Sequence, residues 1–289
     1  MYPPFDPTIF EIGPFALRWY GLLMATAVLT GSWIASREIS RRGKNPEDFW
    51  DMLIWVLIPA FIGARLYYVF IQSPRTSEGI GYYLSNPGRI LQIWGGGIHI
   101  FGAFIFGGIA LWLFTKIRQL PTLMYLDAAV VGLPLAQAIG RWGNFINQEL
   151  YGPPTTLPWG LRINCDSLRP NPPYDYRIAP YEDCNTYPEE STFFHPLFLY
   201  ESLWNLLGFV LIFWLSRRFE NQLKPGDLAL VYLIWYPLGR FFIEFLRTDS
   251  WFFPGTPFNV VHALSFVAVI GAAATLFVRH RGGQLQVRG

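Results

Sequence analysis

The chain has 289 residues, of which 52% are hydrophobic, 18% aromatic and 15% charged, whereas about 25% of an average soluble protein is charged. Lysine and arginine total 22 and aspartate and glutamate total 20, so the net charge is only +2. A nucleic-acid-binding protein would show a basic excess, and a disordered chain would lack so many apolar side chains. Two classes remain, a soluble protein with a very apolar core and a polytopic membrane protein.

Long apolar runs decide between these two classes. A bilayer core about 30 Å thick requires roughly 20 mostly apolar residues in a helix, whereas a soluble helix keeps one polar face. The sequence therefore predicts an all-α polytopic membrane protein with seven spans: Ala16–Ser36, Phe49–Ile71, Ile93–Phe114, Thr122–Ile139, Pro196–Leu215, Asp227–Leu246 and Phe258–Val278.

The distribution of cations predicts the orientation of these spans, because cytoplasmic connections carry an excess of Lys and Arg. One set of connections is short and rich in cations: Arg37, Arg41, Arg42, Lys44, Lys116, Arg118, Arg217, Arg218, Lys224, Arg279, Arg281 and Arg288. The opposite set is longer and has fewer: Arg75, Arg89, Arg162, Arg169, Arg177 and Arg247. We therefore expect the N-terminus outside and the C-terminus in the cytoplasm.

One long polar segment, residues 152–195, separates the fourth and fifth spans. We expect it to form an outer loop inserted into a single integral-membrane domain, 1–289. It contains Cys165 and Cys184, which lie on the oxidising side of the membrane and can pair. Closing a loop of about 20 residues would stabilise it by roughly 3 kcal/mol in the chain-entropy model. The alternative is two free thiols that the loop keeps apart.

Several ionisable residues fall inside the predicted spans, where each costs at least about 2.5–3.5 kcal/mol at the helix centre. We expect Asp127, near the cytoplasmic end, to have an interfacial or helix-start role, and Glu201 to be the structural partner of an arginine. Four cations lie toward the outer ends of their spans: Arg65, Arg141, Arg240 and Arg247. Because the nearby carboxylates are few, these cations predict a phosphate-bearing ligand that enters from the outer leaflet.

The segment 140–152, GRWGNFINQELYG, is too polar for a helix that faces lipid. Its three glycines allow close backbone approach and positive φ. Irregular polar backbone at membrane depth is tolerated where it lines a cavity or is buried in protein. The segment therefore predicts a polar cavity, open outward, for an anionic lipid head group. Gly95–Gly97 would allow a second close approach in the third span.

The segment Gly140–Glu149 resembles the signature of the bacterial phosphatidylglycerol–prolipoprotein diacylglyceryl transferase family. Further similarity follows in chain order: Trp19–Gly21, Gly63–Arg65, Gly96–Gly97, His195–Pro196, Leu199–Glu201, Gly239–Arg240 and Glu244–Arg247. The resemblance implies a multi-pass enzyme of the bacterial plasma (inner) membrane, which catalyses the first step of lipoprotein maturation. Such an enzyme transfers the diacylglyceryl group of phosphatidylglycerol to the lipobox cysteine thiol of a prolipoprotein signal peptide. It implies no cofactor, and its partners are these two substrates and membrane lipids, with no nucleic acid.

The resemblance also implies roles for individual residues. Arg141 would hold the phosphatidylglycerol head group, and Arg240 would be a second essential arginine, because the guanidinium fork binds phosphate oxygens bidentately. Further positions that matter in the family fall on Tyr20, Asn144, Glu149 and Gly152. Their place in the polar segment or near the outer ends of the spans adds three more residues to the predicted lipid site: Asn147, Arg65 and Arg247.

The chain departs from the family at one position. The family usually has a histidine, proposed as a base, where this chain has Phe101, while His99 stands two residues earlier. Residues two apart on a regular helix point about 200° apart, so we expect His99 to face away from the Phe101 position. His99 is then a catalytic candidate only if this backbone is not a regular helix. Together with His195 and His262 it shows no metal-ligand spacing, and we expect no metal.

Two other functions fit the same arginines. A secondary transporter for an organic anion would use them as a substrate clamp, and a non-catalytic lipid-binding scaffold would use them to hold a head group. Thiol transfer follows from the resemblance alone, whereas an anionic ligand follows from the arginines themselves.

Overall fold

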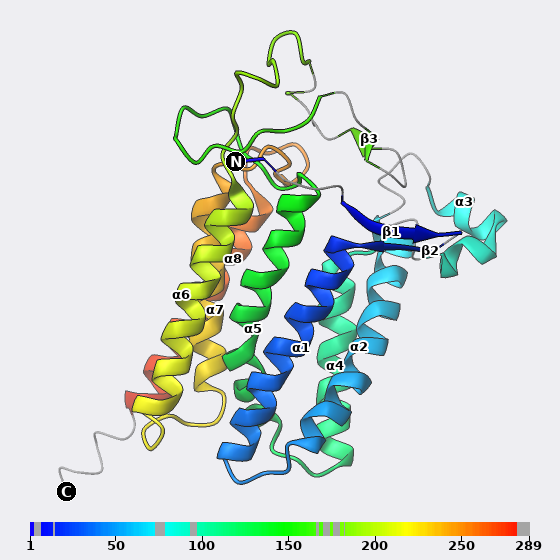
Figure 1. The fold of residues 1–289 in the computed structure, drawn as a ribbon. Helices are drawn as coiled ribbons and strands as arrows, with labels where there is room; N and C mark the ends of the chain where they lie inside the picture. The colour runs from blue at the N-terminus through cyan, green and yellow to red at the C-terminus, as the bar shows by residue number, and fades with distance from the viewer. Residues whose placement is uncertain are drawn as a thin grey trace, which may run out of the picture. The chain divides into compact units, whose positions relative to one another are not determined.

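The computed structural model describes residues 1–2, 7–13, 15–72, 79–92, 97–165, 168–169, 174–175, 180–181 and 183–281. The chain divides into two compact units. The first unit comprises Met1–Ala35 and Leu126–Gly289, and the second comprises Ser36–Tyr125. Both units are mainly helical, which confirms the expected helical architecture (Figure 1). The single integral-membrane domain expected for residues 1–289 stays a prediction.

The first unit contains the hairpin of β1 and β2 and most of the long helices. Helices α6, α7 and α8 lie side by side in this unit (Figure 1). Its elements are β1 (Thr8–Ile12), β2 (Phe15–Arg18), most of α1 (Trp19–Arg41), most of α5 (Thr122–Ile146), β3 (Leu168–Arg169), β4 (Tyr174–Asp175), α6 (Leu197–Arg218), α7 (Asp227–Glu244) and α8 (Val260–Arg281).

The second unit is built on the pair α2 and α4. Its elements are α2 (Glu47–Tyr67), a π-helical turn (Tyr68–Gln72), α3 (Gly79–Ser85), a 3₁₀ turn (Pro87–Leu91) and α4 (Ile100–Ile117). A Cβ atom on Gly102 would lie 2.1 Å from the carbonyl oxygen of Gly63. Glycines at these positions therefore let α2 and α4 approach closely, as small residues do between membrane helices.

In the described part of the chain, five helical segments are long and apolar enough to cross a membrane: Glu47–Ile71, Ile100–Ile117, Thr122–Ile146, Leu197–Arg218 and Val260–Arg281. They correspond to five of the seven predicted spans. Helices α1 and α7 occupy the other two predicted spans but are more polar. Helix α7 carries Asp227, Arg240 and Glu244.

Several span boundaries differ from those predicted, and three of the differences bear on the site. The first helix begins at Trp19 because residues Phe15–Arg18 pair with β1, so Arg18 lies in a strand and not at the start of a span. The third begins at Ile100, after His99 in extended conformation. The fourth continues to Ile146, seven residues past the predicted end. Some residues used above lie outside the described part of the chain: Gly95, Gly96, Arg75, Arg177 and Arg288.

Buried carboxylates organise the Asp227 end of α7. The Asp127 carboxylate accepts hydrogen bonds from the backbone N–H groups of Gly226 (2.7 Å) and Ala229 (3.0 Å), so it caps the start of α7. The predicted helix-start role of Asp127 is therefore confirmed, but Asp127 lies in α5 and caps α7. Asp227 pairs with Arg279 at 3.0 Å and His280 at 2.7 Å, which fixes α8 against α7.

The loop 152–195 and its two flanks share a small apolar core. The buried side chains of this core are Tyr151, Leu161, Ile163, Phe194 and Phe198, the last of which belongs to α6. Backbone hydrogen bonds between Leu161 and Phe194 in both directions hold the two ends of the loop together. Cys165 and Cys184 form a disulfide with a Cα–Cα distance of 6.0 Å. The loop is therefore closed on itself by both a core and a covalent bond.

Candidate functional site

Three arginines from separate segments converge on the carboxylate of Glu201. Glu201 lies one turn into α6, and its side chain is only 2% exposed. Arg141 of α5 approaches its Oε2 atom at 2.5 Å, and Arg240 of α7 donates to Oε1 at 3.0 Å. Arg247, just after α7, lies 3.9 Å from Oε1. The arginine cluster, defined as Arg141, Arg240 and Arg247, thus shares one buried anion.

Two further carboxylates neutralise the arginine cluster. Glu244 accepts from Arg240 at 2.8 Å, one helical turn away on α7, and Asp249 accepts from Arg247 at 2.8 and 2.5 Å. The expectation that these cations exceed the carboxylates near them is therefore wrong for the arginine cluster. Burial raises the pKa of Asp249, but the hydrogen bonds and the charge of Arg247 outweigh this effect and hold that pKa below its ordinary value.

The carboxylate of Glu244 has additional partners. Its Oε1 atom accepts hydrogen bonds from Ser250 Oγ (2.9 Å) and from Asn259 Nδ2 (3.0 Å). These bonds link the end of α7 to the segment before α8, and so they fix the Glu244 side chain that holds Arg240.

The predicted lipid-binding residues in and just after the last turn of α5 form a connected network. Asn144 Oδ1 lies 3.5 Å from Arg141 Nη1, and Asn144 Nδ2 donates to Glu149 at 3.0 Å. Asn147 donates to the other oxygen of Glu149 at 3.2 Å. Glu149 therefore orients two amide side chains, one of which, Asn144, lies next to Arg141.

The backbone of this segment is more regular than predicted. Residues Gly140–Ile146 remain helical because the hydrogen-bond ladder of α5 continues through them. Positive φ falls on Gln148 (53°) and Leu150 (56°) and not on the three glycines.

The glycines act through close contact. A Cβ atom on Gly143 would lie 2.8 Å from the Tyr20 ring, and one on Gly152 would lie 2.7 Å from the carbonyl oxygen of Leu246. Gly143 thereby brings Tyr20 of α1 against α5, directly before Asn144 of the network. Gly152 brings the start of the loop 152–195 against the segment that carries Arg247.

A reciprocal tryptophan pair positions α7 against α6. Trp204 donates its indole N–H to the Trp235 carbonyl, and Trp235 donates to the Trp204 carbonyl, both at 3.0 Å. The two rings stack at 4.5 Å. Gly208 and Gly239 make room for them, since a Cβ atom on Gly239 would lie 2.2 Å from the Trp204 indole nitrogen. Gly239 directly precedes Arg240, so this packing sets where Arg240 meets Glu201.

A cavity of about 570 Å³ adjoins the arginine cluster between the end of α7 and the start of α8. Glu244 and Arg247 border it, and its walls are largely apolar, with Phe245, Phe252 and Phe258. The sequence predicted a polar cavity, whereas this one combines a charged edge with aromatic walls. Such a combination suits an amphiphile better than a free anion.

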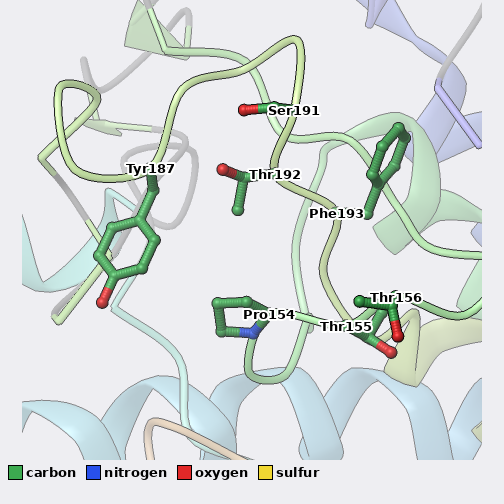
Figure 2. A pocket seen from close by; sticks show the side chains of 7 residues that line it. All are labelled: Pro154, Thr155, Thr156, Tyr187, Ser191, Thr192 and Phe193. Atoms are coloured by element: carbon green, nitrogen blue, oxygen red, sulfur yellow. The ribbon is translucent and has the colours of Figure 1, made fainter.

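A second hollow, of about 510 Å³, lies on the loop 152–195 (Figure 2). It is lined by Pro154, Thr155, Thr156, Tyr187, Ser191, Thr192 and Phe193, which carry five hydroxyl groups and no charge. Figure 2 shows that these side chains come from two stretches that flank the hollow. The backbone N–H of Thr155 donates to Phe193 at 2.7 Å, which joins the two stretches. An uncharged lining cannot bind a phosphate as the arginine cluster can.

Arg65 belongs to the second unit and has a different environment. Its guanidinium donates to three backbone carbonyls, those of Ile90 (2.9 Å), Gly97 (2.6 Å) and Arg89 (2.6 Å). Gly97 has φ +73°, and a Cβ atom there would lie 2.3 Å from Arg65. Arg65 thus ties the segment before α4 to α2.

His99 lies beside Phe101, which corrects the expectation that it faces away. Its backbone is extended (φ −131°, ψ 131°), and its Nδ1 atom accepts from the Phe101 N–H at 3.4 Å as the N-cap of α4. Its ring stacks on Tyr67 at 4.9 Å and lies 5.3 Å from the Phe101 ring. Since His99 precedes the helix, helical spacing does not apply to it.

Sequence reasoning found the arginines and expected Glu201 to be a partner of one of them, but it missed Asp249 as the partner of Arg247. The four-residue spacing of Arg240 and Glu244 on one helix was a visible signal for that pair. The central place of Glu201 had no local signal, because it depends on how three helices pack. Among the described residues, no group of three or more His, Cys, Asp or Glu side chains is arranged to hold a metal ion.

The fold and the site define a class: a helical, multi-pass membrane protein with a cluster of arginines and carboxylates at one end of its helices. The family model of the prolipoprotein diacylglyceryl transferases matches residues 7–278. Three similar proteins are named phosphatidylglycerol–prolipoprotein diacylglyceryl transferase. The relative from Chloroflexus aggregans is 40% identical, over 97% of this chain and 92% of its own length. The one from Synechococcus elongatus is 47% identical, over 84% of this chain and 78% of its own length. The one from Trichormus variabilis is 41% identical, over 95% of this chain and 91% of its own length.

The chain therefore belongs to the prolipoprotein diacylglyceryl transferase family, which confirms the resemblance seen in the sequence.

Proposed function

We propose that this protein transfers the diacylglyceryl group of phosphatidylglycerol to the thiol of the lipobox cysteine in a prolipoprotein signal peptide. Family membership supports this proposal, and the observation that carries it is the convergence of Arg141 and Arg240 on one buried point. Two guanidinium forks so placed can bind the oxygens of a phosphodiester. The apolar-walled cavity beside Arg247 supplies surface for the lipid portion.

In this proposal the protein spans the bacterial inner membrane seven times as one integral-membrane domain, with α1 and α7 as two of the spans. The N-terminus is outside and the C-terminus is in the cytoplasm, so residues 152–195 form an outer insertion. The cluster of Arg141, Glu201 and Arg240 then lies toward the outer side, where phosphatidylglycerol and a translocated signal peptide are both available.

Individual residues have distinct roles in the proposed reaction. Arg141 and Arg240 bind the phosphate, and Arg247 extends the cationic surface toward the cavity. The Asn144, Asn147 and Glu149 network orients Arg141, and Gly152 permits close contact with the segment that carries Arg247. Tyr20 closes the α5 side of the site. Arg65 and His99 keep the segment before α4 in place.

The chemistry requires no cofactor. The sulfur attacks the glycerol carbon that carries the phosphate, the C–O bond breaks, and glycerol phosphate leaves with the electron pair of that bond. A thiolate is the reacting form of cysteine, so the thiol must lose a proton. The arginines stabilise the negative charge that builds on the leaving phosphate, and such preorganised donors contribute about 10²–10³ in rate each.

The test is direct. Purified protein is mixed with phosphatidylglycerol and a lipobox peptide, and mass spectrometry detects the thioether product and glycerol phosphate. Product formation supports the transferase. Transport of an organic anion into vesicles without product would identify a transporter instead, and lipid binding without product would identify a scaffold.

A further inference from the structure

We propose that Glu201 is the proton acceptor for the substrate thiol. This inference rests on the proposed function and assigns the step for which the chain offers no histidine at the usual position. From the sequence, Glu201 is expected to be only a structural partner of an arginine.

The geometry of Glu201 distinguishes its two oxygens. Oε1 accepts a hydrogen bond from Arg240 at 3.0 Å. Oε2 lies 2.5 Å from an Arg141 nitrogen, close enough for an ion pair, but no donor in the described part of the chain is aligned for a hydrogen bond to it. Oε2 therefore keeps a lone pair that can take a proton while Oε1 remains held by Arg240.

The other carboxylates of the site have their oxygens engaged. Glu244 receives Arg240 on one oxygen and both Ser250 and Asn259 on the other. Glu149 receives Asn144 on one oxygen and Asn147 on the other. Taking a proton at either carboxylate would break hydrogen bonds that fix the site, whereas Oε2 of Glu201 loses only an ion-pair contact.

The charges of the reaction favour Glu201. Before transfer, the site holds two positive guanidinium groups, a negative Glu201 and a phosphodiester with one negative charge. When the C–O bond breaks, the leaving phosphate carries two negative charges, as phosphate monoesters approach above their second pKa. If the thiol proton moves to Glu201, the total charge at the site is the same before and after transfer. No net charge then builds up in a buried, poorly solvated place.

Proton transfer to Glu201 also changes what the arginines bind. Hydrogen bonds to an ionised carboxylate are roughly twice as strong as those between neutral groups, so a protonated Glu201 holds Arg141 and Arg240 less tightly. Their N–H donors become available to the phosphate as its charge increases. Interactions that strengthen only in the transition state raise kcat, while interactions present throughout only lower KM.

The experiment compares Glu201→Gln with wild type over a range of pH, using a cysteine peptide and the same peptide with selenocysteine. A selenol ionises at lower pH than a thiol, so it needs no proton acceptor near neutral pH. We expect Glu201→Gln to lower kcat for the thiol peptide by about 10²–10⁴ at pH 7 without raising KM for phosphatidylglycerol. The loss should shrink at least about tenfold with selenocysteine, or above pH 8.5 where the thiol itself ionises.

Glu244→Gln is the matched control, because it removes the other carboxylate partner of Arg240. Its loss of activity should be the same for thiol and selenol and at every pH. If Glu201→Gln does not fold, Glu201→Asp retains a carboxylate one methylene farther away, and its loss should show the same dependence on pH and nucleophile. Wild-type kcat in Glu201→Gln, or a loss that neither selenium nor alkaline pH relieves, would overturn the assignment. Absence of product from wild-type protein would instead overturn the proposed function.

Discussion

Arg141 differs from an ordinary surface cation in how it is held. Glu201 and Asn144 contact its guanidinium from two directions, and its side chain is 23% exposed. A lysine ammonium is a single point charge that cannot engage two partners in this planar arrangement. The identity of the side chain therefore matters here as well as its charge.

We expect Arg141→Lys to lower kcat/KM for transfer by about 10²–10³, the usual effect of removing a preorganised donor. The assay is thioether formation at equal amounts of folded protein. Arg118→Lys serves as control, since Arg118 pairs with Asp51 where both side chains are half exposed, and such pairs contribute little. Near wild-type turnover in Arg141→Lys would contradict the phosphate-binding role.

Two substitutions of His99 distinguish its role as the N-cap of α4 from the role of its imidazole ring. His99→Ala should lower the free energy of unfolding by about 1–3 kcal/mol, because it removes the N-cap of α4 and the stacking on Tyr67. His99→Asn keeps a capping acceptor and should recover part of that loss. Because the Nδ1 atom is engaged by the Phe101 N–H, we expect the pH–rate profile to be unchanged. Disappearance of an ascending limb near pH 6–7 in His99→Ala would show that His99 is the base.

At the residue scale, the sequence predicted which side chains matter better than what they contact. Arg141, Asn144 and Glu149 could be chosen because polar groups are costly at membrane depth. Glu201, the partner of Arg141, lies on another helix, and its contacts with three arginines depend on packing that no local spacing encodes. His99 was misjudged because a cap residue does not follow the helical period.

At the scale of elements, the α6–α7 pair depends on two glycines and two tryptophans. Hydrophobic patterning predicted both helices, but it could not predict their contact, because Gly208 and Gly239 carry no side-chain signal. The same limitation applied to α5, whose polar last two turns were taken for irregular backbone. Those turns are polar because they face Glu201 and Tyr20 within the first unit, not because the helix has ended.

Gly239→Ala tests this contact. The added methyl would overlap the Trp204 ring, which is fixed by its stacking on Trp235, so we expect a loss of about 1–3 kcal/mol in stability. Transfer should also fall, since Arg240 follows directly in the chain. Gly271→Ala in α8 is the control, because nothing lies within 4 Å of its added Cβ. Thermal unfolding of the two variants in the same detergent makes the comparison, and equal melting temperatures would show that α6 and α7 do not depend on this packing.

At the scale of the whole molecule, the question is whether α1 and α7 cross the membrane. Helix α7 has 18 residues, about 27 Å at 1.5 Å per residue, close to the thickness of a bilayer core. Its charges lie at its two ends and are paired, Asp227 with Arg279 and Arg240 with Glu201. Pairing offsets the cost of charge in a membrane, so low apolarity alone does not exclude a span.

For α1, packing contacts also support a membrane span. Its polar residues Ser32 and Ser36 are buried in protein. A Cβ atom on Gly132 of α5 would lie 2.0 Å from the carbonyl oxygen of Gly31. Small residues at such close contacts are typical of packed membrane helices.

The number of spans determines which side of the membrane each connection faces, and this gives a decisive test. In a cysteine-free Cys165→Ser/Cys184→Ser background, single cysteines are placed at exposed positions on either side of each helix in question. Glu11 and Asn45 bracket α1, and Asn221 and Thr256 bracket α7.

With seven spans, Glu11→Cys and Thr256→Cys should react with a membrane-impermeant maleimide in spheroplasts, whereas Asn45→Cys and Asn221→Cys should react only after permeabilisation. If only the five more apolar helices crossed, each pair would fall on one side and the two members would react alike. Labelling of both members of either pair from outside would therefore refute that span, while opposite labelling of both pairs would establish an outer N-terminus and a cytoplasmic C-terminus.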